Sequence, residues 1–293
     1  MFSQKRKSRA SVIIAVAALV TATILMSGCG SKAQSGLSPK ISPPAIKVAG
    51  TLRAGIDMTH PPFGGVDHGK QAGLDLDTAA ALAQKLGLKL EVVSVMPSEA
   101  ATALAQGKVD AVFSVPFSDG SLTSVSLAGS YVSDAPAFFI ATDSTASVSP
   151  SMTLDTLSAT RVAVQQGSAA YWKLLSELGS GSVKPYSTLR SAMDALNKGK
   201  VSVVGGDALV GGYIARDFPR VHFAGQLDSA VPIGVAVAPE NSKLGDSIRQ
   251  ALDSLAADGV FDAIRQKWVG DLPKLRSPTS TESSVSTSPS VNP

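Results

Sequence analysis

Two short segments of this sequence place groups that suit the binding of a charged small molecule. Asp57 directly follows the predicted strand Leu52–Ile56, so its carboxylate lies at a strand end, where it can accept hydrogen bonds from an ammonium or amide group. Gly167-Ser168 precedes a helical pattern, and the free amides at a helix N-terminus attract anions. Each segment also has a simpler interpretation, because Asp caps turns and Ser caps helices.

These groups depend on strands and helices that alternate along the chain. Apolar residues at helical spacing in 77–86 predict a helix that Gly87 ends. Alternation of this kind favours an α/β fold with a largely parallel sheet. The further predicted strands are 88–95, 109–113, 201–204 and 231–238, and the further predicted helices are 98–106 with Ser98 as N-cap, one after Gly167-Ser168, 244–255 and 260–268.

The second half of this pattern repeats the first. Ala103–Val112 matches Ala195–Val204 at six positions, and Thr51–Asp57 corresponds to Thr160–Gln166. Unrelated helix-to-strand turns have similar sequence preferences, and these alone can produce such a match. A true repeat predicts two similar α/β lobes, with the last helices returning to the first lobe. The chain then crosses twice between lobes, which makes a hinge and places a ligand cleft at the ends of the two sheets.

The charge is concentrated at the start of the chain. Lys plus Arg total 26 and Asp plus Glu total 23, but four of the basic residues lie in the first 28 positions, which leaves 22 basic residues against 23 acidic ones. A near-neutral remainder lacks the clustered basic face that nucleic-acid binding needs. With 293 residues, the chain has room for two lobes at about 100–200 residues per domain.

The single cysteine, Cys29, follows a basic cluster, the apolar run Val12–Met26 and two small residues, which is the layout of a secretory signal. Leu25-Met26-Ser27-Gly28-Cys29 resembles a bacterial lipobox, although Met26 stands where Leu is usual. We therefore predict a lipid anchor on Cys29; an uncleaved membrane helix is the alternative. The predicted domains are a signal peptide 1–28, a flexible tether 29–49, lobe 1 at 50–135 plus 232–271, lobe 2 at 136–231 and a disordered tail 272–293.

Seven short motifs stand in the order and spacing of one family. They are TLRAGIDMTHPPFGG, Gly73–Asp77, Leu104–Asp110, Val164–Ser168, Gly206-Asp207, Pro232–Ala236, and Ala257–Gly259 with Lys267-Trp268. With them the sequence resembles the family 3 extracellular solute-binding proteins, which deliver polar amino acids to ABC importers. The resemblance covers nearly all of Gly50–Asp271 and implies a periplasmic binding protein type 2 fold, in which two lobes close on a ligand.

The resemblance also assigns a binding role to particular residues. Asp207 holds the ligand's α-ammonium, unless it only caps the helix that starts at Ala208. His60 stands where many relatives carry an aromatic side chain that stacks on the ligand, while Phe63 is expected in the core. The complete predicted ligand set is Asp57, His60, Phe117, Ser118, Gln166, Gly167, Ser168 and Asp207.

One departure from the family concerns the ligand's carboxylate. Amino-acid binders of this family carry a Thr-x-x-Arg segment whose Arg clamps that carboxylate with two hydrogen bonds. Here Ser118 stands for the Thr and Ser121 for the Arg. Losing such a pair costs roughly 2–5 kcal/mol for a carboxylate ligand. We therefore expect a cationic or neutral solute, or a carboxylate held only at the helix end after Gly167.

The sequence thus predicts a lipid-anchored, monomeric binding component of an ABC importer that works with a membrane permease. It predicts no enzyme, no cofactor, no metal and no nucleic-acid partner, because one cysteine excludes a cysteine-based zinc site and no nucleophile motif is present. A signalling lipoprotein that kept the fold but lost transport is the main alternative. A dehydratase-like enzyme, with His60 and an aspartate as acid and base, is the weaker one.

Overall fold

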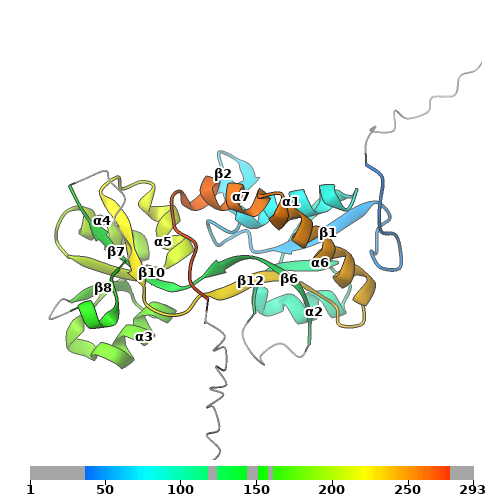
Figure 1. The fold of residues 1–293 in the computed structure, drawn as a ribbon. Coiled ribbons are helices and arrows are strands. Elements are labelled where there is room, and N and C mark those ends of the chain that lie inside the picture. Colours follow the sequence, from blue (N-terminus) through cyan, green and yellow to red (C-terminus); the bar gives the residue numbers. More distant parts are fainter. Residues whose placement is uncertain (1–36, 118–123, 144–150, 158–160, 278–293) are drawn as a thin grey trace, which may run out of the picture. The chain divides into compact units, whose positions relative to one another are not determined.

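Two five-stranded sheets form the framework of the protein (Figure 1). The structure is a computed structural model that describes residues 37–117, 124–143, 151–157 and 161–277, all within the unit Leu37–Pro293. Each sheet with its helices forms one lobe, which confirms the predicted two-lobe α/β fold. A short antiparallel hairpin of β2 (Gly65–Asp67) and β3 (Lys70–Ala72) stands apart from both sheets.

The first sheet has the strand order β4-β1-β5-β12-β6. Its strands are β1 (Thr51–Ile56), β4 (Lys89–Ser94), β5 (Ala111–Pro116), β6 (Ser126–Asp134) and β12 (Val231–Val237). Strand β1 pairs in parallel with β4 and β5 and is buried at five of its six residues, Arg53 among them. Strands β12 and β6 are antiparallel, so the sheet is mixed rather than largely parallel as predicted. The direction reverses because β12 enters this sheet from the other lobe.

Helices cover the first sheet and bring the end of the chain back to it. They are α1 (Leu74–Lys85), the 3-10 turn η1 (Pro97–Glu99), α2 (Ala100–Ala105), α6 (Ser242–Ala257) and α7 (Val260–Val269). Helices α6 and α7 both contact α1, as the sequence predicts. The prediction of Ser98 as an N-cap is wrong, because Ser98 lies inside η1 and α2 begins after Glu99 without a side-chain cap.

The second sheet has the order β11-β7-β10-β8-β9. Its strands are β7 (Pro136–Ala141), β8 (Val162–Gln165), β9 (Val183–Tyr186), β10 (Val203–Asp207) and β11 (Val221–Gln226). The helices of this lobe are α3 (Ala169–Leu178), α4 (Leu189–Asn197) and α5 (Ala208–Ala215), with the 3-10 turns η2 (Leu154–Thr156) and η3 (Ser180–Ser182).

The two sheets repeat one topology. Strands β9-β8-β10 are all parallel, like β4-β1-β5, and each trio continues into an antiparallel pair of strands. The internal sequence match therefore reflects a repeated supersecondary unit and not only the similar sequence preferences of turns. Ala54 pairs with Ala111 in the first sheet, and Val162 pairs with Val203 at the equivalent position of the second sheet. Ala54 therefore corresponds to Val162, whereas the predicted alignment of the two segments places it opposite Ala163, one residue later.

Two segments join the sheets. The chain leaves the first sheet at Asp134, the last residue of β6, and enters the second at Pro136, the first residue of β7. It returns between β11 and β12, where Val231 pairs with Asp134. The two joining strands are thus hydrogen-bonded to each other and run side by side, as Figure 1 shows for β6 and β12.

The folded part begins earlier than the sequence predicts. Residues 29–49 were expected to be a flexible tether, yet Ile41, Ala45 and Ile46 are buried in the core of the first lobe. The prediction missed them because the Pro and Ser residues around them hide any periodicity. Cys29 and the signal segment lie outside the described residues.

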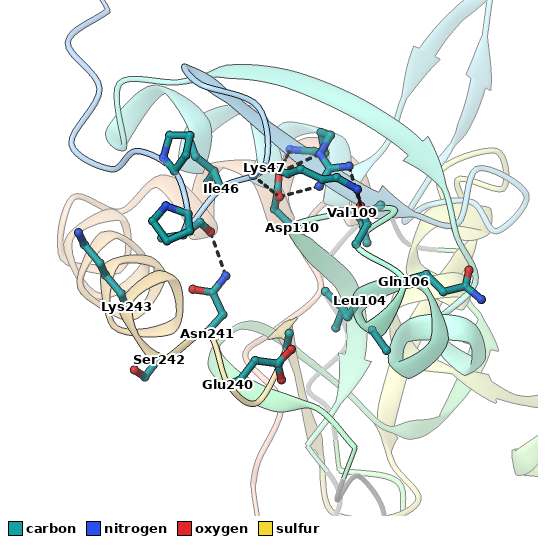
Figure 2. Close-up of a pocket in the computed structure, with 17 residues that line it drawn as sticks. Ile46, Lys47, Leu104, Gln106, Val109, Asp110, Glu240, Asn241, Ser242 and Lys243 are labelled. Carbon is teal, nitrogen blue, oxygen red and sulfur yellow. Dashed lines mark hydrogen bonds and ion pairs between the residues drawn. The ribbon is translucent and has the colours of Figure 1, made fainter.

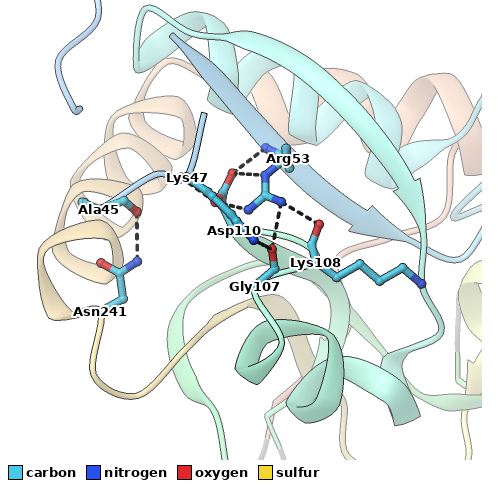
Figure 3. Close-up of polar contacts among 7 residues, drawn as sticks. All are labelled: Ala45, Lys47, Arg53, Gly107, Lys108, Asp110 and Asn241. Atoms are coloured by element: carbon cyan, nitrogen blue, oxygen red, sulfur yellow. Dashed lines mark hydrogen bonds and ion pairs between the residues drawn. The ribbon is translucent and has the colours of Figure 1, made fainter. Parts of the chain in front are cut away.

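Polar contacts fasten this N-terminal segment to the first lobe (Figure 3). The Asp110 carboxylate accepts hydrogen bonds from the Lys47 amide at 3.1 Å and from the Arg53 amide at 2.9 Å, and it forms an ion pair with the Arg53 guanidinium at 2.8 Å. The Asn241 side chain donates to the Ala45 carbonyl oxygen at 2.9 Å. The segment is therefore held at two points.

The end of the folded part also extends past the prediction. Residues 272–293 were expected to be disordered, but Leu272 is buried and the Arg276 amide donates to the Gln226 side chain at 2.6 Å. Residues 278–293 lie outside the described part of the chain. Within that part, no helix is long and apolar enough to cross a membrane.

Candidate functional site

The predicted site residues follow the carboxyl ends of four strands. Asp57 comes directly after β1, Phe117 after β5, and Gln166 after β8, while Asp207 is the last residue of β10. Ends of this kind are where open α/β sheets bind ligands. Ser118 and Ser121 lie outside the described residues, so the position predicted to replace the carboxylate-binding Arg has no structural description.

Asp57 forms the turn after β1. Its Oδ1 accepts hydrogen bonds from the Thr59 amide at 2.9 Å and from the Thr59 hydroxyl at 2.6 Å. Its carboxylate is therefore already engaged in capping a turn, the simpler of the two predicted roles. Phe63 is buried as expected, and the exposed ring of His60 lies 5.7 Å from the ring of Phe63.

Asp207 carries a carboxylate without a hydrogen bond to any residue that the structure describes. It occupies the N-cap position of α5 with an extended backbone, yet its side chain caps nothing. Burial raises the pKa of Asp207, and the facing charge of His60 opposes that shift. His60 follows β1 of the first sheet, so groups from both lobes lie within electrostatic range of this carboxylate. Such an acid is poorly hydrated and still has its full acceptor capacity.

The capping role at α5 belongs to Asp134, which sequence reasoning missed. Asp134 Oδ1 accepts hydrogen bonds from the Ala135 amide at 2.9 Å and the Leu209 amide at 3.0 Å. Burial raises the pKa of Asp134 to about 7, the backbone donors oppose the shift, and the charge of Asp207 adds to it. Two acids therefore lie close together where the chain crosses between the lobes. The sequence does not predict β6, so it does not place Asp134.

A second acid that the sequence did not single out lies inside the first lobe. Asp75, in the first turn of α1, is fully buried and accepts hydrogen bonds from the Ser114 hydroxyl at 2.6 Å and the Tyr131 hydroxyl at 2.5 Å. Burial raises its pKa to about 7; the two hydroxyl donors oppose the shift, and the charge of Asp57 adds a smaller raising effect. This network links α1, β5 and β6 beneath the turn of Asp57.

The segment Gln166–Ser168 connects β8 to α3. The Gln166 amide donates to the Tyr186 carbonyl oxygen at 2.9 Å. Gly167 has a φ of +78° and no atom within 4 Å of where a side chain would begin, so a ligand can approach its backbone. Ser168 caps α3 by accepting a hydrogen bond from the Tyr171 amide at 3.1 Å. Capping leaves the serine hydroxyl proton free to donate, which agrees with both predicted roles.

Phe117 is held by its backbone next to β12. Its amide donates to the Pro232 carbonyl oxygen at 2.8 Å, and its partly exposed ring lies against Gly234, where a side chain would collide with it. No metal cluster of His, Cys, Asp or Glu occurs among the residues the structure describes.

A cavity of about 780 Å³ lies in the first lobe, away from the strand ends that carry the predicted ligand residues. Figure 2 shows it between the N-terminal segment, the turn after α2 and the start of α6, lined by residues such as Lys47, Gln106 and Glu240. None of the predicted ligand residues lines it. The cavity therefore does not coincide with the predicted site.

The sequence matches the family model "Bacterial extracellular solute-binding proteins, family 3" over residues 52–271. It is 23% identical to the "Putative ABC transporter arginine-binding protein 2" of Escherichia coli, covering 75% of this chain and 91% of the relative. It is 27% identical to the "L-arginine-binding protein" of Pseudomonas aeruginosa, covering 78% and 91%. It is 24% identical to the "L-cystine-binding protein TcyJ" of Escherichia coli, covering 86% and 93%.

Two solved structures also match most of the chain. The "Ancestral Cationic Amino Acid Solute Binding Protein (AncCDT-1)" matches with a TM-score of 0.66 at 24% identity, over 75% of this chain and 96% of that one. "An ancestral arginine-binding protein bound to arginine" matches with a TM-score of 0.53 at 31% identity, over 75% and 99%. The curated relatives are binding proteins rather than enzymes, which confirms the prediction of a non-enzymatic protein.

Proposed function

Because the chain belongs to the bacterial extracellular solute-binding proteins of family 3, we propose that it is the lipid-anchored, extracytoplasmic binding component of an ABC importer. It binds solute as a monomer and delivers it to a membrane permease. Two lobes joined by two paired strands support a receptor that acts through conformational change. The sequence around Cys29 supports the lipid anchor.

We infer that the solute is a small, polar, amine-bearing molecule of the amino-acid type. Asp207 carries this inference: its carboxylate is partly buried, and it accepts no hydrogen bond from the described residues. A poorly hydrated carboxylate is stabilised by a bound ammonium or guanidinium through short, charge-assisted hydrogen bonds. The relatives named for arginine and cystine bind amino acids that carry such groups.

The carboxylate end of the solute has weaker support. Ser121 replaces the expected Arg in the sequence, and the amides around Gly167 with the Ser168 hydroxyl are neutral donors. A neutral donor set stabilises a carboxylate less than a guanidinium does. We therefore expect the positive charge of the solute to contribute more to affinity than its carboxylate.

A calorimetric comparison of three solutes tests this order. L-Arginine carries two cationic groups and a carboxylate, putrescine has two cationic groups and no carboxylate, and L-glutamine is zwitterionic. We expect arginine and putrescine to bind the mature protein more tightly than glutamine. Submicromolar glutamine binding would contradict the proposal.

Asp207→Asn tests the site itself. Removing one partner of a desolvated charge pair costs about 2–5 kcal/mol, so the affinity for arginine should fall at least about 30-fold. Asp217→Asn is the matched control, because Asp217 is an exposed acid of the same lobe that pairs with Arg190 at 2.7 Å. Equal affinities of the wild type and Asp207→Asn, with the fold intact, would exclude Asp207 as the cation partner.

Cys29→Ser tests the anchor. The variant should move from the membrane fraction to the soluble or culture fraction, because it lacks the thiol that would carry the lipid. An unchanged membrane fraction, with no lipid mass on the wild-type peptide, would disprove lipidation at this residue.

A further inference from the structure

Asp134 joins the crossover to the first turn of a helix in the second lobe. It is the last residue of β6 and pairs with Val231 in the first sheet. Its Oδ1 lies 3.0 Å from the amide nitrogen of Leu209, the second residue of α5. The adjacent carbonyl oxygen of Ala135 accepts a hydrogen bond from the Ala208 amide at 2.8 Å. The first two amides of α5 are therefore both bonded to the crossover.

This contact performs the work that an N-cap residue normally does. An aspartate at the N-cap accepts a hydrogen bond from the second or third amide of its own helix, and Asp is among the preferred residues there. Asp207 occupies the N-cap of α5 with φ −71° and ψ 137°, which suits capping, but its side chain makes no such bond. The Leu209 amide, one of the two amides that Asp207 could cap, is already taken by Asp134.

We propose that Asp134 is a positioning residue for solute binding, which caps α5 in place of Asp207 and so keeps the Asp207 carboxylate available to a cation. The inference rests on the proposed function, in which Asp207 binds the positive group of the solute. Without Asp134, the Asp207 carboxylate would turn to its own helix, and a bound cation would have to compete with that cap.

The cap needs an acceptor oxygen and not a charge. Burial raises the pKa of Asp134 to about 7, so its carboxyl is partly protonated near neutral pH and still accepts both hydrogen bonds through Oδ1. Asn offers the same oxygen at the same position, whereas Ala offers none. Comparing Asp134→Asn with Asp134→Ala therefore separates the cap from the charge.

Thr188 supplies a matched control. It caps α4 in the same lobe, with its hydroxyl accepting a hydrogen bond from the Ser191 amide at 3.1 Å. Thr188→Ala removes a helix cap of the same type, but from a helix whose N-cap is not a predicted ligand residue. It should lower stability without changing affinity.

The first measurement is calorimetric titration of the mature protein with L-arginine. Asp134→Ala should weaken binding about tenfold, the equivalent of losing one cap of about 1.4 kcal/mol. Asp134→Asn and Thr188→Ala should stay within about threefold of the wild type. An equal loss in Asp134→Asn and Asp134→Ala would overturn the proposal in favour of charge. An equal loss in Thr188→Ala would overturn it in favour of general destabilisation.

The second measurement is thermal unfolding without solute, which remains decisive whatever the solute is. In the Asp134→Ala background Asp207 has become the cap, so the additional Asp207→Ala change should lower stability. In the wild-type background the same change should cost nothing or stabilise, because it removes a poorly hydrated carboxylate. Equal effects in both backgrounds would overturn the proposal. If this coupling is present but Asp207→Asn binds arginine normally, the capping exchange holds and the proposed function fails.

Discussion

The two lobes repeat one strand order, yet they stabilise it by different means. The buried charged or polar side chains among the described residues belong to the first lobe: Arg53, Asp75, Thr78 and Asp110. The pairing registers make Arg161 the counterpart of Arg53, and the sequence repeat makes Ser202 the counterpart of Asp110. Arg161 and Ser202 are both exposed, and among the described residues the Arg161 guanidinium donates only to the Val183 carbonyl oxygen, at 3.5 Å.

The difference shows what a repeated α/β unit must keep. The strands need their apolar residues, and both lobes have them. The ion pair is needed only where the chain gives it a further task, and in the first lobe Asp110 also binds the amide of Lys47 in the N-terminal segment. The second lobe can dispense with the acid, because the Arg stays hydrated when its partner is absent.

Asp110→Ser makes the first lobe like the second and should have the largest effect. It leaves the Arg53 guanidinium buried without its carboxylate and the Lys47 amide without its acceptor. Breaking a buried ion pair by removing one partner costs about 3–5 kcal/mol. Urea unfolding measures the loss. A loss below about 1 kcal/mol would show that this pair is as replaceable as a surface pair.

Asp75→Asn should remove a pH dependence that originates in the first lobe. Burial raises the pKa of Asp75 from its ordinary 3.8 to about 7, so between these values the folded state holds a proton that the unfolded state releases. The wild type should therefore be most stable below about pH 4 with respect to this group and lose stability as the pH rises towards 7.

Between pH 5 and pH 7 the loss should amount to about 2 kcal/mol relative to Asp75→Asn. Unfolding at a series of pH values measures the difference between the two proteins. Parallel stability curves for the wild type and the variant would contradict the assignment, whatever the other titrating groups contribute.

Ser202→Asp makes the second lobe like the first and should have the smallest effect. The new carboxylate would meet an exposed Arg161, and an exposed pair contributes about 0–1 kcal/mol. The gain should also disappear at high salt. A gain comparable with the loss in Asp110→Ser would mean that the two lobes differ less than their burial indicates.

Much of the fold could be predicted because its strands and helices carry strong local signals. Strand β1 and helices α6 and α7 lie close to their predicted ranges. The sequence does not predict β6, β7 and β11, which stand outside the strand-helix alternation, nor the short strands β2, β3 and β9. The sequence therefore does not identify the crossover residues Asp134–Pro136, although the repeat predicts that the chain crosses twice between the lobes.

In the candidate site too, residues with a local sequence signal could be predicted, and residues that depend on distant contacts could not. Asp207 and Ser168 were identifiable because each stands where a strand ends and a helix begins. Asp134 and the Ser114–Asp75 contact depend on residues 75 and 39 positions apart, and no local pattern reports such pairs. Only the folded chain shows that Asp134, rather than Asp207, caps α5.

The fastening of the N-terminal segment affects where a shortened recombinant form can begin. The family match starts at residue 52, and a form trimmed to that point would lose Ile41, Ala45 and Ile46 from the core. The resulting gap would expose apolar surface and invite aggregation during purification. A form that begins at Leu37 retains these side chains and the amide that Asp110 binds, so it is the better choice for crystallisation and binding assays.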